Sequence, residues 1–242
     1  MRKSQILKKC LFLTCIAIII MIVISIMVRY EVEGEKNLPY TISKILVVST
    51  VEGVPTDDGV NIWNVNLKQA NDLYFYIEKS EDTDQTIKQI TLQNFSLTKE
   101  PQKGEVKIYR PTGDLNNLYT YSEQNYLGES LSYTGAKIDD LKTLEIANNG
   151  GVIGFRIAIE DLGNFISNET TEITYDASLL NNIEVSLEDI NFILNFDILI
   201  ETNENITYQG NMSIELPAND LFEKGSSNFE ITDFSNVVFK RI

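Results

Sequence analysis

The chain has 242 residues, of which 43% are hydrophobic, 35 are acidic, 20 are basic and none is histidine. This hydrophobic content predicts a packed core and argues against disorder. The lack of histidine excludes Ser–His–Asp and Cys–His catalysis and removes the commonest transition-metal ligand. Five basic residues and no acidic residue lie in the first 29 positions, so the rest of the chain has a formal net charge of −20, which argues against nucleic acid as a partner.

Residues 10–28 form an apolar stretch of 19 residues without charge, proline or glycine. As a helix the stretch would span about 28 Å, which matches the roughly 30 Å hydrocarbon core of a bilayer. We therefore predict a transmembrane helix at residues 10–28 with the lipid bilayer as its partner. Both cysteines, Cys10 and Cys15, fall in this stretch, so the remaining chain can form neither a disulfide nor a cysteine zinc site.

The basic residues on the two sides of this stretch predict its orientation. Four precede it and two follow it closely: Arg2, Lys3, Lys8 and Lys9 against Arg29 and Lys36. The positive-inside rule then places residues 1–9 as a cytoplasmic tail and the C-terminal part outside the cell. A cleaved signal peptide is the alternative, but its apolar region is shorter and ends in small residues, which residues 25–28 do not supply. The pattern therefore favours an uncleaved signal anchor in the cell membrane.

Residues 29–40 form a polar stalk, and from residue 41 onward the hydrophobic period is two, which is typical of strands. The clearest case is residues 190–200, where apolar side chains alternate with Asn191, Asn195 and Asp197. We predict strands at 41–51, 60–66, 72–78, 87–98, 105–109, 152–160, 183–187, 190–200, 212–216 and 236–240. This pattern predicts an all-β ectodomain, an antiparallel β-sandwich, over residues 41–242.

Three local features refine this expectation. The hydrophobic phase slips after Leu92, which predicts a β-bulge at Gln93–Asn94. Asn149–Gly150–Gly151 predicts a tight hairpin turn before the next strand. Residues 136–146 fit a short helix as well as a strand, and the sequence leaves that choice open.

A weakly repeated sequence pattern, here called the glycine–proline echo, suggests that the β-rich part could have arisen by internal duplication. Gly104 opens a predicted strand that Pro111 closes, and Gly210 and Pro217 repeat this spacing. The echo leaves two architectures open: one β-sandwich, or two similar β units divided near residue 135.

The acidic residues do not predict a catalytic, cofactor or metal site. The densest acidic positions are Asp57–Asp58, Glu81–Asp84 and Asp139–Asp140, whose spacing matches no calcium loop and favours solvated loops. Glu78 and Glu160 are candidates for the carboxylate pair of a glycoside hydrolase, but they are indistinguishable from ordinary strand ends. We therefore predict no catalytic residue and no cofactor.

Aromatic residues gather between positions 118 and 133. Tyrosines on a sheet face can stack on sugars or form a protein-binding patch. More often, such tyrosines are strand residues that pack partly on the core. These residues, with the single tryptophan, are Tyr119, Tyr121, Tyr126, Tyr133 and Trp63. Four sites also fit the glycosylation pattern, as expected by chance in a chain rich in Asn, Ser and Thr: Asn94, Asn168, Asn205 and Asn211.

The segment Tyr30–Tyr40, followed by Ile42–Ile45, resembles uncharacterised single-pass membrane proteins of low-GC Gram-positive bacteria, especially clostridia. The segments Ile108–Pro111 and Val238–Arg241 are similar to that group too. The resemblance implies a bacterial, membrane-anchored extracytoplasmic protein, and it carries no activity, ligand or site.

These observations predict a non-catalytic interaction or structural module of the cell envelope with an envelope protein as its partner. The acidic charge of the ectodomain suits solubility and, functionally, a preference for cations or basic partners. A carbohydrate- or calcium-binding module is the alternative, and a carboxylate-based hydrolase is a further one.

Overall fold

The computed structural model describes residues 2–30, 38–57, 62–81, 83–114, 116–136, 144–168 and 176–242. Side chains are described for these residues except at 2–10, 26–30, 56–57, 62–63 and 168. The helices are α1 Arg2–Tyr30, η2 Glu123–Asn125, η4 Ala177–Ile183, α2 Leu187–Ile190 and α3 Leu221–Lys224. The strands are β1 Tyr40–Asp57, β2 Ile62–Lys79, β3 Ile87–Lys99, β4 Glu105–Tyr109, β5 Ser130–Ala136, β6 Glu145–Ala147, β7 Gly150–Asn168, β8 Phe192–Thr202, β9 Thr207–Leu216, β10 Ser227–Ile231 and β11 Lys240–Arg241.

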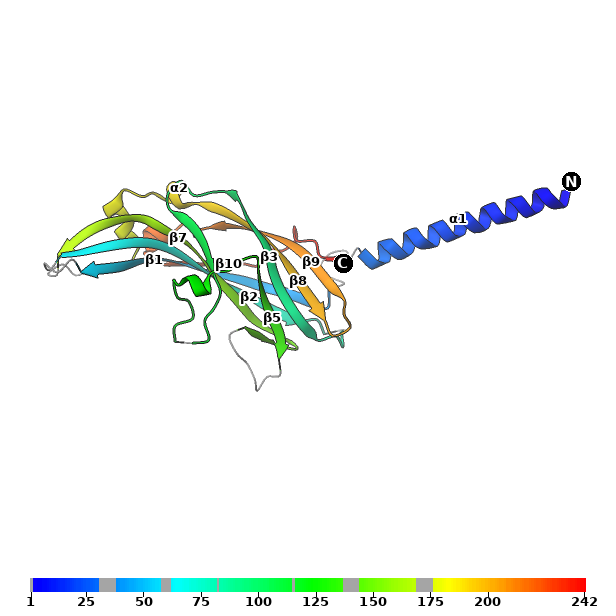
Figure 1. Ribbon diagram of the computed structural model, residues 1–242, viewed down its shortest axis with the longest axis horizontal. Helices are drawn as coiled ribbons and strands as arrows, with labels where there is room; N and C mark the ends of the chain where they lie inside the picture. Colours follow the sequence, from blue (N-terminus) through cyan, green and yellow to red (C-terminus); the bar gives the residue numbers. More distant parts are fainter. Residues whose placement is uncertain are drawn as a thin grey trace.

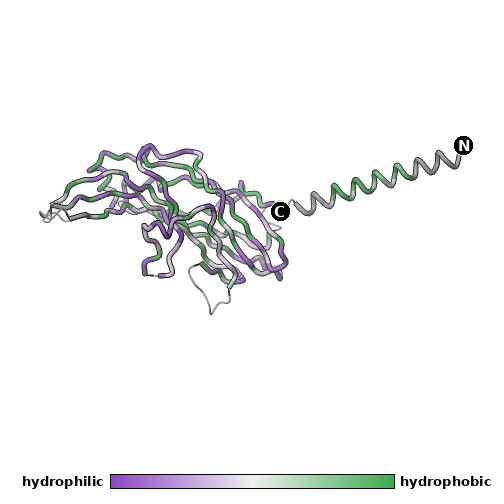
Figure 2. Tube along the Cα trace, viewed as in Figure 1, coloured by the Kyte–Doolittle hydropathy of each residue, from purple (hydrophilic) through white to green (hydrophobic). Residues whose placement is uncertain are grey.

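Helix α1 contains the predicted apolar stretch and extends away from the strands as a separate rod (Figure 1). Its side chains at residues 11–25 are exposed, and Figure 2 shows this part of the helix as apolar. In the described part of the chain, no helix reaches the length and hydropathy expected of a membrane span. The transmembrane helix at 10–28 therefore stays a prediction.

The strands form two sheets, which confirms the all-β, sandwich-like fold. One sheet has five strands in the order β10-β1-β2-β7-β4, and the other has six in the order β11-β9-β8-β3-β5-β6. Every pairing is antiparallel except that of β5 with β6. Because β1, β2 and β7 are long, the five-stranded sheet offers a wide outer face.

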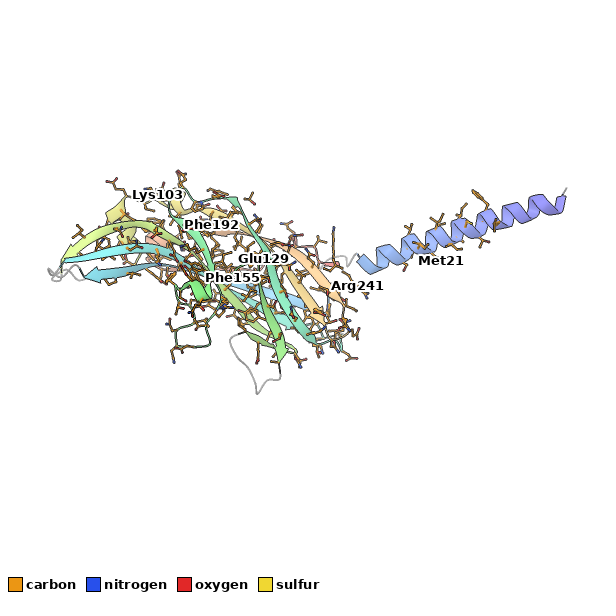
Figure 3. The ribbon with its side chains drawn as sticks, viewed as in Figure 1. Met21, Lys103, Glu129, Phe155, Phe192 and Arg241 are labelled. Carbon is orange, nitrogen blue, oxygen red and sulfur yellow. The ribbon has the colours of Figure 1, made fainter. Side chains whose placement is uncertain are left out.

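Four phenylalanines join the two sheets at the centre of the core. Phe75 and Phe155 come from the five-stranded sheet, and Phe95 and Phe196 come from the six-stranded sheet. The ring centroids of Phe155 lie 5.9 Å from Phe75, 5.5 Å from Phe95 and 5.7 Å from Phe196. Figure 3 labels Phe155 near the middle of the β-rich part of the chain. The alternation that predicted the strands thus places one aromatic per central strand on the inner face.

The two halves of the chain do not form separate units. The five-stranded sheet places β7 between β2 and β4, and the six-stranded sheet places β8 beside β3. The split near residue 135 is therefore wrong as a domain boundary, because both sheets combine strands from both halves. The two strands of the glycine–proline echo, β4 and β9, lie in different sheets.

Several local predictions can be compared with the strands. The β-bulge is confirmed, since the register of β3 with β8 shifts between Gln93 and Ser96 and Asn94 has a φ of 57°. The turn at Asn149 exists, but it joins β6 in one sheet to β7 in the other, so the predicted hairpin is wrong. Of residues 136–146, 137–143 lie outside the described residues, and 145–147 form β6.

Two predicted strands are wrong, and two strands were not predicted. Residues 183–187 form the end of η4 and the start of α2, because the apolar residues there sit in short helical turns. Strand β11 is Lys240–Arg241, so it shares only Lys240 with the predicted strand at 236–240. Strands β5 and β10 are only seven and five residues long, so each offers just two alternating apolar side chains.

Candidate functional site

The segment between β4 and β5, here called the tyrosine loop (residues 110–129), lies against the outer face of the five-stranded sheet. It is tied to β4 by hydrogen bonds from Arg110 N to Asn125 O at 3.0 Å and from Leu127 N to Ile108 O at 2.9 Å. Within the loop, Thr112 N donates to Leu118 O at 2.7 Å. This green segment carries η2 in Figure 1.

The regular alternation of β2 places charged residues under this loop. Leu67, Gln69 and Asn71 are buried on the core face of β2, so Lys68 and Asp72 lie on its outer face. The register with β7 shifts beside Lys68, because three β7 residues, 160–162, lie opposite this single residue. Gln69 and Asn71 bond each other, with Gln69 Nε2 lying 2.9 Å from Asn71 Oδ1. The period-two alternation of β2 therefore determines which of its side chains reach the site.

Arg156 on β7 is the centre of the site. Its Nε and Nη2 donate to the two carboxylate oxygens of Asp72 at 2.6 and 3.0 Å, and its Nη1 lies 3.0 Å from Glu52 Oε1. Its guanidinium carbon lies 5.0 Å from the ring centroid of Tyr119 and 5.5 Å from that of Tyr121. The two tyrosines of the loop thus stack on a cation that two carboxylates hold in place. Both carboxylates are bound to Arg156, so neither is placed as an unpaired general acid or base.

A second group of charges continues along the same face. Glu160 lies 3.3 Å from Lys68 Nζ and 3.5 Å from Lys107 Nζ, and it accepts a hydrogen bond from the Tyr109 hydroxyl. Lys68 Nζ also lies 4.1 Å from the ring centroid of Tyr121. Tyr121 therefore contacts both charge groups and links them through its ring.

Two hollows open beside Tyr119. One, of about 530 Å³, is lined by Glu52, Asp72, Arg156 and the loop. The other, of about 320 Å³, lies toward β6 and the start of β7. Tyr74, Leu118 and Tyr119 line both hollows, so the Tyr119 side chain stands between them.

Burial changes the acidity of these groups. Burial raises the pKa of the Asp72 carboxyl, against the opposing effect of the hydrogen bonds from Arg156. Burial also raises the pKa values of Tyr119 and Tyr121 far above the ordinary tyrosine value. Burial lowers the pKa of Arg156, but the bonds to Asp72 outweigh it, so the guanidinium stays charged.

We expect the tyrosines to ionise in two groups. Burial raises the pKa of Tyr40, Tyr74 and Tyr133 to about 12 each, whereas an exposed tyrosine titrates near pH 10. A raised folded-state pKa contributes stability that is fully present below about pH 10 and is lost as the pH rises through about 12. Ultraviolet titration of tyrosinate should show a delayed group that merges with the first group after denaturation. A single step near pH 10 in the folded protein would contradict this.

The outer face of the six-stranded sheet differs in chemistry. It presents hydroxyl and amide side chains, including Thr91 and Ser132, whose oxygens lie 3.1 Å apart. Asp197 is only 8% exposed and accepts hydrogen bonds from Asn94 Nδ2 at 2.7 Å, from Gln209 Nε2 at 2.9 Å and from Asn211. These contacts make Asp197 a fixed part of the sheet surface.

Known proteins offer no guide to this site. No family model, no curated protein and no solved structure matches the chain. The functional interpretation therefore rests on the geometry of the chain itself.

The structure separates the carboxylates that the sequence offered as a pair. Glu78 pairs with Gly150 on β7, and Glu160 lies ten residues further along that strand, which corresponds to about 30 Å. A hydrolase built on Glu78 and Glu160 is therefore excluded. Of the acidic positions, Asp58, Asp82, Asp139 and Asp140 lie outside the described residues, as does the side chain of Asp57. Within the described ranges, no three carboxylates gather closely enough to hold a metal ion.

The tyrosine cluster lies partly where the sequence indicated a functional patch. Tyr119 and Tyr121 contact the Arg156 site, and Tyr126 lies beside Tyr109 with ring centroids 5.1 Å apart. Tyr133 is buried in β5 and bonds the backbone of Gly154. The side chain of Trp63 lies outside the described residues.

The glycosylation pattern falls on residues with other contacts. Asn94 and Asn211 bond Asp197, and Asn205 Oδ1 accepts a hydrogen bond from Lys88 Nζ at 3.0 Å. The side chain of Asn168 lies outside the described residues. These contacts favour structural roles for the three described asparagines.

Sequence reasoning missed Glu52, Asp72 and Arg156. The available signal was Arg156 itself, a basic residue between Phe155 and Ile157 in an acidic domain. An arginine in the middle of a strand calls for a carboxylate partner on the neighbouring strand.

Proposed function

We propose that this protein is a membrane-anchored, extracytoplasmic binding module of the bacterial cell envelope, and that it acts without catalysis. The observation that carries the proposal is the Arg156 site, where two carboxylates and two tyrosine rings surround one cation beside an open hollow. Aromatic residues and arginine are the side chains most enriched at protein interfaces. An envelope protein is therefore the proposed partner.

The charge of the site indicates the kind of partner. Glu52 and Asp72 outnumber Arg156, so the larger hollow has a net negative charge, as does the ectodomain. Complementary charge speeds association and discriminates against wrong partners. A partner with a basic surface is the one that this site suits.

The anchor belongs to the same proposal. The exposed apolar side chains of α1 at residues 11–25 suit lipid, and the basic residues before them favour a cytoplasmic N-terminus. External protease on intact protoplasts should remove the domain at 41–242 and leave residues 1–28 protected. Survival of the domain under conditions that digest it after lysis would contradict the orientation.

Recovery of a partner tests the binding role. Full-length protein, crosslinked in protoplasts and purified, should retain a specific envelope protein. A matched preparation of the Asp72→Asn/Arg156→Met variant should lose it. Recovery of the same proteins from both preparations, or of none, would count against the proposal.

Carbohydrate binding is the second candidate, and the six-stranded sheet favours it. Its outer face carries hydroxyl and amide groups such as those of Thr91, Ser132 and Asn195, which can bond sugar hydroxyls. Calorimetric titration with soluble wall fragments should give heat that Thr91→Val/Ser132→Ala abolishes. No heat from the unaltered protein would end this candidate.

A further inference from the structure

The smaller hollow beside Tyr119, here called the Tyr119 pocket, has the walls of a binding pocket. Its volume is about 320 Å³, near the lower end of the range for small-ligand pockets. Apolar walls come from the tyrosine loop, β6 and β7, and tyrosine rings from three different segments line it: Tyr74, Tyr119 and Tyr133. The start of β7 contributes Gly150, Gly151 and Gly154, whose backbone forms one wall of the pocket.

One polar group in this pocket has no partner. Tyr119 is 7% exposed, and its hydroxyl makes no hydrogen bond within the described part of the chain. A side chain added at Gly154 would lie 3.2 Å from this hydroxyl, so the hydroxyl stands at the glycine wall of the pocket. A buried hydroxyl without a partner is costly, and a ligand that bonds it would remove that cost.

The charges around the pocket select the class of ligand. Glu145 lines it, and none of the described residues that line it is basic. The ring of Tyr119 also lies between this pocket and the hollow of Glu52 and Asp72. Carboxylates and aromatic faces together attract organic cations and disfavour anions.

The geometry points to a binding pocket for an alkylammonium group, namely a lysine side chain presented by the partner protein. The alkyl chain of lysine would contact apolar walls such as Leu118 and Ile146, and its ammonium would be stabilised by Glu145 and by the tyrosine rings and hydroxyl. This inference rests on the proposed binding role and names the anchor residue that the partner would supply.

The test compares amino-acid probes on the full-length protein in detergent. Nα-acetyl-lysine N-methylamide should bind about tenfold more tightly than the norleucine analogue, which has the same alkyl chain without the amine. N-acetylglucosamine serves as the neutral sugar probe. Equal binding of the lysine and norleucine probes, or binding of the sugar alone, would overturn the inference.

Two variants separate binding from folding. Tyr119→Phe removes only the hydroxyl, so it should weaken binding of the lysine probe several-fold while thermal stability stays equal or rises. Glu145→Gln should weaken the lysine probe but leave the norleucine probe unchanged. Tyr208→Phe is the matched control and should leave binding intact, because Tyr208 is a buried tyrosine of β9 that does not line the pocket and is separated from β5 by β8 and β3.

If Tyr119→Phe or Glu145→Gln bound the lysine probe as tightly as the unaltered protein, that result would contradict the assigned pocket. Such a failure is distinguishable from failure of the proposed function. A partner could still be recovered by crosslinking and lost with the Asp72→Asn/Arg156→Met variant even if the lysine probe did not bind.

Discussion

Replacing Arg156 by methionine should destabilise the protein by about 3 kcal/mol, because it leaves Asp72 largely buried without its cation. Both side chains are mostly covered, with 13% of Arg156 and 16% of Asp72 exposed. The change also removes the cation on which Tyr119 and Tyr121 stack. Denaturant unfolding would measure the loss.

A double-mutant cycle isolates the pair. The loss of unfolding free energy in Asp72→Asn/Arg156→Met should be smaller than the sum of the losses in the two single variants, because each single change leaves one unpaired group. Lys88→Met is the matched control: Lys88 lies 2.6 Å from Glu201, but its side chain is 51% exposed. Its loss should stay below about 1 kcal/mol. Equal losses from Arg156→Met and Lys88→Met would contradict the account of the site.

Replacing Phe155 by alanine should cost about 3–5 kcal/mol, since it empties the centre of the core. Phe155 is fully buried and contacts aromatic rings of both sheets. Phe155→Leu should cost less, because leucine fills most of the same space. Thermal or denaturant unfolding of both variants is the measurement.

Phe229→Ala is the control for this series. Phe229 is half-buried on the edge strand β10, where solvent can replace lost contacts. The loss of unfolding free energy in Phe229→Ala should be well below that in Phe155→Ala. A similar loss at both positions would mean that the four phenylalanines do not hold the two sheets together.

The sequence predicts the strands better than their arrangement. The alternation around Phe155, Phe196 and Met212 follows directly from burial of one strand face, and the bulge at Asn94 follows from the phase slip in that alternation. Strand order depends on contacts between distant segments, which local periodicity does not contain. The turn at Asn149 shows this, because its glycines fit a hairpin but the chain crosses between sheets.

The site was less predictable for a related reason. Tyr119 and Tyr121 lie in a loop without periodicity, and Asp72 occupies an ordinary outward position of β2 whose partner on β7 local periodicity does not reveal. Glu52 lies on β1 and Arg156 lies on β7. These two residues come together only because both strands pair with β2. The clustered tyrosines in the sequence indicated an aromatic patch. The charged residues at its centre could be identified only once the order of the strands in the sheet was known.

We propose that the Arg156 face of the five-stranded sheet binds an envelope partner. Site-specific photocrosslinking in intact cells tests it most directly, with a photoreactive phenylalanine derivative placed at Asn117 on this face or at Ser213 on the opposite sheet. Both positions are exposed. The account predicts a discrete crosslinked species from position 117 and none from position 213. The same product from both positions, or a product from position 213 alone, would contradict it.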